Sequence, residues 1–334
     1  MGNNDRFANR PLAVDWREIK GMTALRTGVR YLYAPFMMVG LIGAGYAVVA
    51  NGYSYVWLAA ILFMAIATAF AAEKISPWHA EWNEPHGDEA ANVMHWLVYE
   101  MSAIHGIILI PTITWLFPFP GLWPTEWPLL VQFLLAFVIA DFAFTMLHYL
   151  SHRWPLLWRL HAVHHGVGRL YGFNGVVRHP LHQSVDMIVG TLPLVILGMP
   201  VEVAILLGLA ISITLIVQHS NVSYELGPLK KYLAIGEVHH LHHVNWGSEG
   251  DCNFGLLFSH WDRLLGTFHP EPPRTIRADD MGIDEVPHFP KTFVEQLIFP
   301  FVYQPGKGEP ERYRAGGKGH PEEGPSPGPM HPAE

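Results

Sequence analysis

The sequence has 334 residues with a formal net charge of −8; half of the residues are apolar and only 15% are charged. This composition is typical of a protein solvated by a membrane rather than of two soluble domains. A single cysteine excludes a disulfide framework and a cysteine-based metal site, and the lack of a Lys/Arg block argues against nucleic acid as a partner.

The chain opens with thirty polar residues that contain six Lys or Arg and do not have the pattern of a signal peptide. Four apolar segments follow, each close to the roughly 20 residues that cross about 30 Å of hydrocarbon; they cover 34–50, 53–72, 97–117 and 127–147. A further apolar stretch at 185–217 is broken at Gly198-Met199-Pro200, which predicts a helical hairpin that either dips into the bilayer or crosses it twice. The sequence therefore predicts an all-α integral membrane protein with four transmembrane helices and an apolar hairpin.

Lys and Arg indicate which side of the membrane each loop faces, because they concentrate in cytoplasmic segments. With a cytoplasmic N-terminus, the outer loops fall at 51–52 and 118–126, and neither contains Lys or Arg. Aromatic residues typical of the headgroup region flank the second loop: Trp115, Phe117, Phe119, Trp123 and Trp127. We expect a multi-pass protein whose N-terminus and whose segments 148–184 and 218–334, a histidine-rich helical cap, are cytoplasmic.

These patterns divide the chain into three parts. We expect residues 1–30 to be a polar N-terminal segment and residues 31–303 to form one membrane-embedded catalytic domain. From residue 304 the sequence is rich in Gly, Pro and Glu and poor in apolar residues, so the composition predicts a disordered tail at 304–334.

Histidine is unusually abundant, with 21 copies, and three groups of it have helical spacing. Residues at i, i+3 and i+4 share one helical face, so each group can direct its imidazoles at a common point. The groups are His148 and His152; His161, His164 and His165; and His239, His240, His242 and His243. Pro155 should end the helix between the first two groups and let the second fold back. Crowded imidazoles near a membrane are expected to be neutral and shared by metal ions.

The number of histidines favours two metal ions. A catalytic zinc uses three protein ligands and water, so eight or more histidines exceed the needs of one ion. Imidazole binds iron, zinc, copper and nickel alike, and the ligand type alone does not name the metal. A Glu-x-x-His pattern of the kind found in di-iron carboxylate bundles occurs at Glu237–His240.

Over residues 73–268 the chain resembles the fatty acid hydroxylase and sterol desaturase superfamily of integral-membrane di-iron oxygenases. The resemblance rests on the histidine groups together with Glu73–Pro77, Trp82-Asn83, Gly87-Asp88, Asp141, Trp158–His165, Arg178–Pro180, His219–Asn221, Asn253–Gly255 and Trp261–Thr267. It implies O2-dependent hydroxylation or desaturation of a membrane lipid at two irons. No segment of the sequence resembles a flavin, haem or iron–sulfur domain, so we expect the electrons to come from a separate electron-transfer protein. The ligands that it implies are His148, His152, His161, His164, His165, His219, His239, His242 and His243, of which all except His219 are also expected to be catalytic.

Three polar residues are candidates for the outer hydrogen-bond partners of these ligands. Asp141 lies seven residues before His148, on about the same helical face, and could accept the second N–H of an imidazole. Asn245 and Asp262 could do the same for the third group. The roles of His179, His182 and His240 stay open, although His240 should point to a different face from His239.

Two other classes of function remain as alternatives. A membrane zinc-dependent lipid hydrolase would leave most of the histidines without a task. A metal transporter would place its ligands near the middle of crossing helices rather than at their ends. The sequence does not choose between sterol-like, fatty acyl, ether-lipid and aminolipid substrates, nor does it give the oligomeric state.

Overall fold

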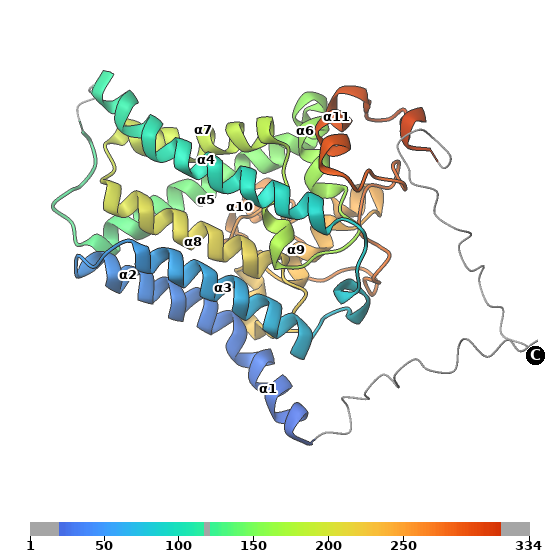
Figure 1. The fold of residues 1–334 in the computed structure, drawn as a ribbon, viewed down its shortest axis with the longest axis horizontal. Helices are drawn as coiled ribbons and strands as arrows, with labels where there is room; N and C mark the ends of the chain where they lie inside the picture. The colour runs from blue at the N-terminus through green and yellow to red at the C-terminus, as the bar shows by residue number, and fades with distance from the viewer. Residues whose placement is uncertain (1–19, 117–120, 315–334) are drawn as a thin grey trace, which may run out of the picture.

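The computed structural model describes residues 20–116 and 121–314, and these residues contain helices and isolated bridges but no strand. The long helices run side by side along the longest axis of the molecule (Figure 1). Their bounds are Lys20–Pro35 (α1), Phe36–Leu41 (η1, a π-helix), Ile42–Ala50 (α2), Val56–Ile75 (α3), Glu89–Leu116 (α4), Leu129–Arg153 (α5), Pro180–Leu197 (α7) and Val201–His219 (α8).

Short helices gather at one end of this bundle and form a cap (Figure 1). They are Ala80–Asn83 (η2), Pro155–His165 (α6), Gly172–Val176 (η3), Gly227–Lys231 (η4), Glu237–His240 (α9), Leu241–His243 (η5), Gly247–Gly250 (η6), His260–Leu265 (α10), Phe293–Val302 (α11) and Glu311–Tyr313 (η7). At the opposite end, the turn before α5 meets the turn between α7 and α8, where Leu122 N–H donates to the Leu197 carbonyl at 3.0 Å.

Five helical segments are long and apolar enough to cross a membrane: Met22–Ala50, Val56–Ile75, Leu129–Arg153, Pro180–Leu197 and Val201–His219. They include three of the four predicted spans and both arms of the predicted hairpin. The arms have 18 and 19 residues, or about 27–28 Å of helix, so each is close to the thickness of the hydrocarbon layer. The predicted span 97–117 corresponds to α4, which starts earlier, at Glu89.

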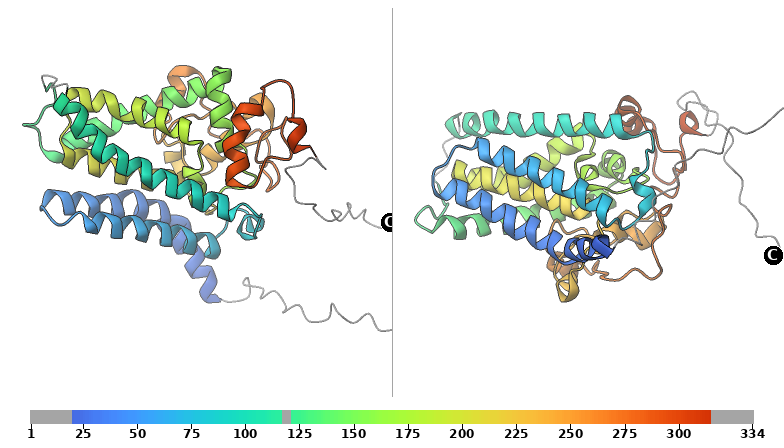
Figure 2. Two further views of the ribbon diagram at one scale, coloured as in Figure 1. Left: turned by 45° about the horizontal axis from the view of Figure 1, so that its top comes forward. Right: turned by 60° about the horizontal axis from the view of Figure 1, so that its bottom comes forward.

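The first span also starts earlier than the apolar run at residue 34. Helix α1 passes through the π-helix η1 into α2 without a break, and Pro35 stands at the junction. Proline cannot donate a backbone hydrogen bond, so a change of helical pitch next to it is expected. The start of α1 points away from the bundle (Figure 2). Further along the helix, Arg30 forms an ion pair with Glu225.

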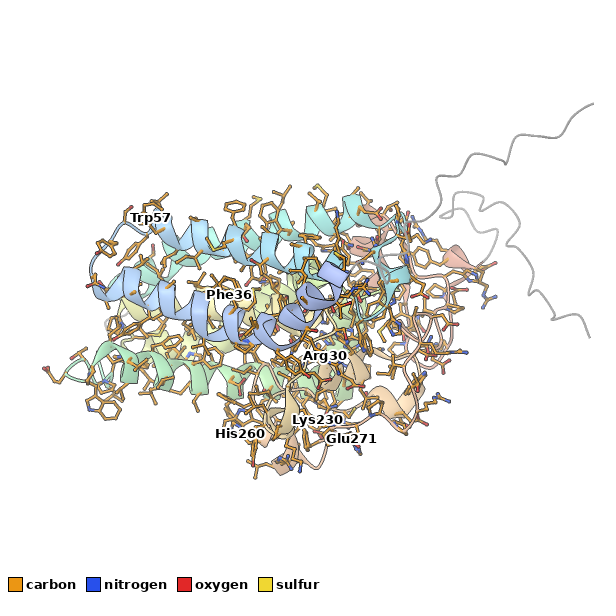
Figure 3. All side chains as sticks on the ribbon, turned by 90° about the horizontal axis from the view of Figure 1, so that it is seen from below. Arg30, Phe36, Trp57, Lys230, His260 and Glu271 are labelled. Atoms are coloured by element: carbon orange, nitrogen blue, oxygen red, sulfur yellow. The ribbon has the colours of Figure 1, made fainter. Side chains whose placement is uncertain are left out.

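Large apolar side chains on the outer faces of the spans point away from the bundle, as Phe36 and Trp57 do in Figure 3. Trp57 is 59% exposed, which suits a lipid-facing position. The buried faces carry small residues instead, such as Ala65, Ala136 and Ala140. Within a bilayer, helices associate by close packing rather than by escape from water, and small residues allow that close approach.

Two residues of the predicted aromatic belt have described side chains, and they differ. Trp127 is half exposed, whereas Trp123 is buried, and its indole N–H donates to Gln132 at 2.8 Å. Trp123 therefore packs the end of the bundle and is not a headgroup anchor. Phe117 and Phe119, together with the side chain of Trp115, lie outside the described residues.

The beginning of the predicted tail packs onto the cap. Tyr313 is completely buried against Phe299, and its hydroxyl donates to Glu295 at 3.1 Å. The expectation of disorder from residue 304 is therefore wrong for residues 304–314, because one aromatic anchor outweighs the polar composition around it. Residues 315–334 lie outside the described part of the chain.

The contact between α7 and α5 gives a test of this packing. A Cβ added at Gly190 would collide with the ring of Phe144, whereas nothing lies within 4 Å of a Cβ at Gly208. We expect Gly190→Ala to destabilise the protein by about 1–3 kcal/mol, since overpacking forces side chains from their rotamers. Gly208→Ala is the control and should leave the thermal midpoint in detergent unchanged; equal midpoints for the two variants would contradict this packing.

Candidate metal centre

Nine histidines converge where α5 and α8 enter the cap. His148 and His152 occupy the last turns of α5, and Pro155, as the first residue of α6, separates that helix from the next. His219 is the last residue of α8. The other six come from cap helices: His161, His164 and His165 from α6, His239 from α9, and His242 and His243 from η5.

The first group consists of His148, His152, His161, His165 and His242. One ring nitrogen from each of them lies within 4.8 Å of all the others. The Nε2 atoms of His148 and His242 are 2.8 Å apart, and His165 Nε2 is 3.1 Å from the Nε2 atoms of His152 and His161.

The second group consists of His164, His219, His239 and His243, all buried. Its Nε2 atoms are also in contact, at 3.3 Å between His164 and His219, 3.2 Å between His219 and His239, and 3.1 Å between His239 and His243. The groups adjoin, since the rings of His165 and His243 stack at 4.5 Å. All nine histidines that the resemblance implied as ligands belong to one group or the other.

The outer nitrogens of the rings fix which inner nitrogens carry hydrogen. His148 Nδ1 lies 2.9 Å from the Phe254 carbonyl, and His242 Nδ1 lies 2.7 Å from that of Cys252. A carbonyl only accepts, so both Nδ1 atoms must donate, and in a neutral ring Nε2 then has a bare lone pair. The two Nε2 atoms that face each other at 2.8 Å therefore cannot hydrogen-bond to one another.

The second group repeats this arrangement. His164 Nδ1 donates to the Val177 carbonyl and His219 Nδ1 to the Leu215 carbonyl, each at 3.0 Å. Their Nε2 lone pairs then meet at 3.3 Å. Opposed lone pairs repel unless a cation lies between them. At the bond lengths of about 2.1 Å found for imidazole on a metal, two nitrogens at right angles are about 3 Å apart, so both groups fit a metal ion.

Burial keeps these rings neutral. In the cap, burial and then the neighbouring imidazoles lower the pKa of each of six rings well below the ordinary value: His161, His164, His165, His239, His242 and His243. A neutral imidazole is the form that binds a transition metal.

Asp141 does not accept a hydrogen bond from an imidazole, in contrast to the sequence prediction. It is fully buried and accepts from the N–H groups of Leu257 and Phe258 and from the Trp261 indole at 2.7–3.3 Å. Seven helical residues separate it from His148, which is about 10 Å along the axis and too far for direct contact. Asp141 instead anchors the loop that follows Phe254.

Asp262 holds the other part of the same loop. Its carboxylate accepts from Phe254 N–H at 2.8 Å and from Gly255 N–H at 2.9 Å. Phe254 in turn offers its carbonyl to His148, so Asp262 acts on a ligand ring through one residue. The side-chain amide of Asn245 donates only at long range, to the carbonyls of Asp279 at 3.4 Å and Met281 at 3.5 Å, and these bonds tie it to the 279–281 segment rather than to a ligand ring.

Three histidines of undecided role lie outside both groups. His240 faces away from His239, as expected, with its ring 4.5 Å from that of Trp78. His179 caps α7 by accepting from Leu181 N–H. His182 is buried between Ser151, at 3.0 Å, and Asp186, at 3.2 Å.

The sequence analysis missed two polar features. Asp251 accepts from His152 Nδ1 at 2.9 Å, which makes it the only carboxylate bonded to a ring of the two groups within the described residues. Arg178 pairs with Asp186 at 2.8 Å in the wall of a cavity. The motif Arg178–Pro180 contains this arginine, but no spacing in the sequence indicates that Asp186 is its partner.

That cavity lies beside both histidine groups. His148 and His161 of the first group line it together with His164, His219 and His239 of the second. Apolar side chains from two spans complete its wall, Phe144 of α5 and Leu215 of α8. An apolar molecule in this cavity would therefore lie next to both candidate metal sites.

The neutral rings predict how stability depends on pH. Because the six cap histidines have lowered pKa values in the fold, the unfolded chain takes up more protons as the pH falls below about 6.5. We expect the thermal midpoint of chelator-treated protein to fall between pH 7.5 and pH 5.5, and His165→Gln to weaken this dependence. A midpoint that does not change with pH would contradict the neutral assignment.

Comparisons with known proteins agree with this geometry. The sequence model of the fatty acid hydroxylase family matches residues 133–267, the segment that contains all nine histidines. The chain is 31% identical over 283 residues to the ornithine lipid hydroxylase OlsE of Rhizobium tropici, which covers 81% of this chain and 83% of that protein.

Alkylglycerol monooxygenases are more distant relatives. The zebrafish (Danio rerio) protein is 28% identical over 54% of this chain and 39% of its own length, and the human protein is 26% identical over 42% and 31%. No solved structure matches the chain significantly. The long match to the Rhizobium protein and the match to the family across the histidine groups together show that this chain belongs to the fatty acid hydroxylase family and is an oxidoreductase.

Proposed function

We propose that the protein is an O2-dependent lipid hydroxylase that holds one iron in each histidine group. The ligands would be His148, His152, His161, His165 and His242 for one iron and His164, His219, His239 and His243 for the other. When bound, the two irons would supply the reduction of dioxygen that oxidation of an unactivated C–H bond requires. Zinc lacks redox chemistry, and a zinc hydrolase would use about three of these nine rings.

The observation that carries this proposal is the pairing of bare Nε2 lone pairs in both groups. The chain has built outer partners for five rings, namely the carbonyls of Leu215, Val177, Cys252 and Phe254 and the carboxylate of Asp251. Each partner orients a ring and turns its lone pair inward. Such outer hydrogen bonds are the usual way in which proteins orient metal-bound histidines.

The surrounding residues keep this arrangement in place. Asp141 and Asp262 anchor the loop of residues 254–258, and this loop positions the carbonyl that holds His148. The cavity next to the groups offers apolar side chains from the membrane spans and one buried ion pair, Arg178–Asp186. The apolar part of its wall, Phe144 and Leu215, would shield the reacting carbon of a lipid from water.

The substrate that we favour is an aminolipid of the ornithine-lipid type. This choice rests on the relative from Rhizobium tropici, which aligns with more than four fifths of each chain. An ether lipid is the second candidate, because alkylglycerol monooxygenases align with the histidine-containing segment. The reaction would be hydroxylation rather than desaturation, as in the names of both kinds of relative.

The histidine groups would face the cytoplasm, because Lys and Arg are absent from the turns at the opposite end of the bundle. Electrons would come from a separate electron-transfer protein. The catalytic unit would comprise residues 31–303 and, since Tyr313 packs on α11, extend to about residue 314.

Removing a ligand should remove iron and activity together. We expect His164→Ala and His242→Ala each to lose at least half of the bound iron and to form product at least 100-fold more slowly, because each variant lacks one ligand of a group. His240→Gln is the matched control, since its ring belongs to neither group, and it should keep its iron. Metal analysis and product assays on the same samples test this; iron retained in both alanine variants would contradict the ligand assignment.

Product identity can be tested by comparing lipids from cells with and without the protein. We expect the intact protein to convert an ornithine-type lipid to a species heavier by one oxygen atom, and the His164→Ala protein to make none. Mass spectrometry of total lipid extracts measures this shift. An added oxygen found only in ether lipids would transfer the assignment to the second substrate class.

A further inference from the structure

Trp158 of α6 contacts the first histidine group and begins a chain of hydrogen bonds that continues away from it. Its ring centroid lies 4.8 Å from that of His152 and 5.5 Å from that of His165. It is partly exposed at the surface of the cap. Its contact with two rings of the first group singles this side chain out.

A hydrogen-bonded chain continues from Trp158. Its indole N–H donates to the hydroxyl of Tyr303 at 3.2 Å, and the Tyr303 hydroxyl donates to the carboxylate of Glu285. Tyr303 is fully buried, and burial together with Glu285 raises the pKa of its phenol, which therefore stays protonated at neutral pH. Glu285 is also held by the N–H groups of Gly306 and Gly308 near the surface.

Tryptophan and tyrosine are the side chains most readily oxidised by one electron, and a phenol loses its proton when it loses an electron. A carboxylate hydrogen-bonded to the phenol is therefore placed to receive that proton. Reduction of a resting iron by an electron carrier does not require oxidation of a phenol, so such a proton acceptor has a role only when a strongly oxidising equivalent leaves the site. The direction of the chain, from ligand rings through Trp158 and Tyr303 to Glu285, favours the removal of oxidising equivalents.

We propose that Trp158, Tyr303 and Glu285 form a protective path that drains oxidising equivalents from the metal site when no lipid is bound. This inference rests on the proposed function. An oxidising equivalent that finds no C–H bond takes one electron from Trp158. Tyr303 then gives an electron to Trp158 and its phenolic proton to Glu285, and becomes a neutral radical. A small thiol then gives one electron to Tyr303 and releases its own proton to water, and Glu285 returns the phenolic proton to Tyr303. Two such events leave two thiyl radicals, which combine to a disulfide.

The test uses iron-loaded protein that is reduced and then mixed with oxygen in the absence of lipid. We expect freeze-quench electron paramagnetic resonance to detect a tyrosyl radical in the intact protein and to lose it in Tyr303→Phe and Trp158→Phe. Peptide mass spectrometry should then find at least threefold more oxidation of His152 and His165 in both variants. With lipid present, Tyr303→Phe should form product in the first turnover within twofold of the intact protein.

Tyr313→Phe is the matched control, because Tyr313 is equally buried and is bonded to Glu295 but not to Trp158. It should behave like the intact protein, whereas Glu285→Gln should reduce the radical yield. Equal radical and equal damage in Tyr303→Phe and the intact protein would overturn the proposal. So would slower reduction of the irons by an electron carrier in Trp158→Phe without added damage, which would make Trp158 an electron entry point. Intact protein that binds no iron would instead remove the proposed function and this path with it.

Discussion

Nine histidines form a crowded cluster in which outer hydrogen bonds turn five rings so that a lone pair faces inward, and the cap is organised around this cluster. Such a cluster is unfavourable by itself, since lone pairs at about 3 Å repel and the rings are removed from water. The fold stabilises it from the outside, with carbonyls and one carboxylate that accept from the Nδ1–H groups. A cation within each group would supply the missing attraction from the inside. The cap thus holds the rings in the arrangement that a bound metal ion would need.

The loop after η6 shows how a membrane span helps to position the histidine rings. Asp141 is buried in α5, where a carboxylate is costly, and all of its partners are groups of the loop or of α10. Through that loop it supports His148, two turns further along its own helix. A substitution at Asp141 therefore acts on the site by releasing the loop, and its effect should depend on whether Asp262 still holds the other end.

Sequence reasoning predicted the parts of this site that are local in the chain. The helical spacing identified eight of the nine clustered histidines, and the apolar runs identified the spans that deliver them. His219 needed the resemblance, because it is a single histidine at the end of a helix. The Phe254 carbonyl, Asp251 and the true role of Asp141 could not be predicted, because each depends on a loop that folds back from about 100 residues away. The predictions for Trp123, as a headgroup anchor, and for Tyr313, within a disordered tail, were wrong for another reason. Average composition does not reveal which single aromatic side chain is buried.

The site lies at the ends of the spans, where an apolar substrate can reach it from the membrane and electrons can reach it from the cap. Phe144 and Leu215 belong to spans and line the cavity, whereas Asp251 and Trp158 contact His152, a ring of the first group that does not line it. Lipid and electrons would then approach opposite sides of the histidine groups. An oxidising equivalent formed while lipid is absent would oxidise the ligand rings themselves. The chain from Trp158 to Glu285 starts at His152 and His165, which do not line the cavity, so a drain along it would compete least with the oxidation of a bound substrate.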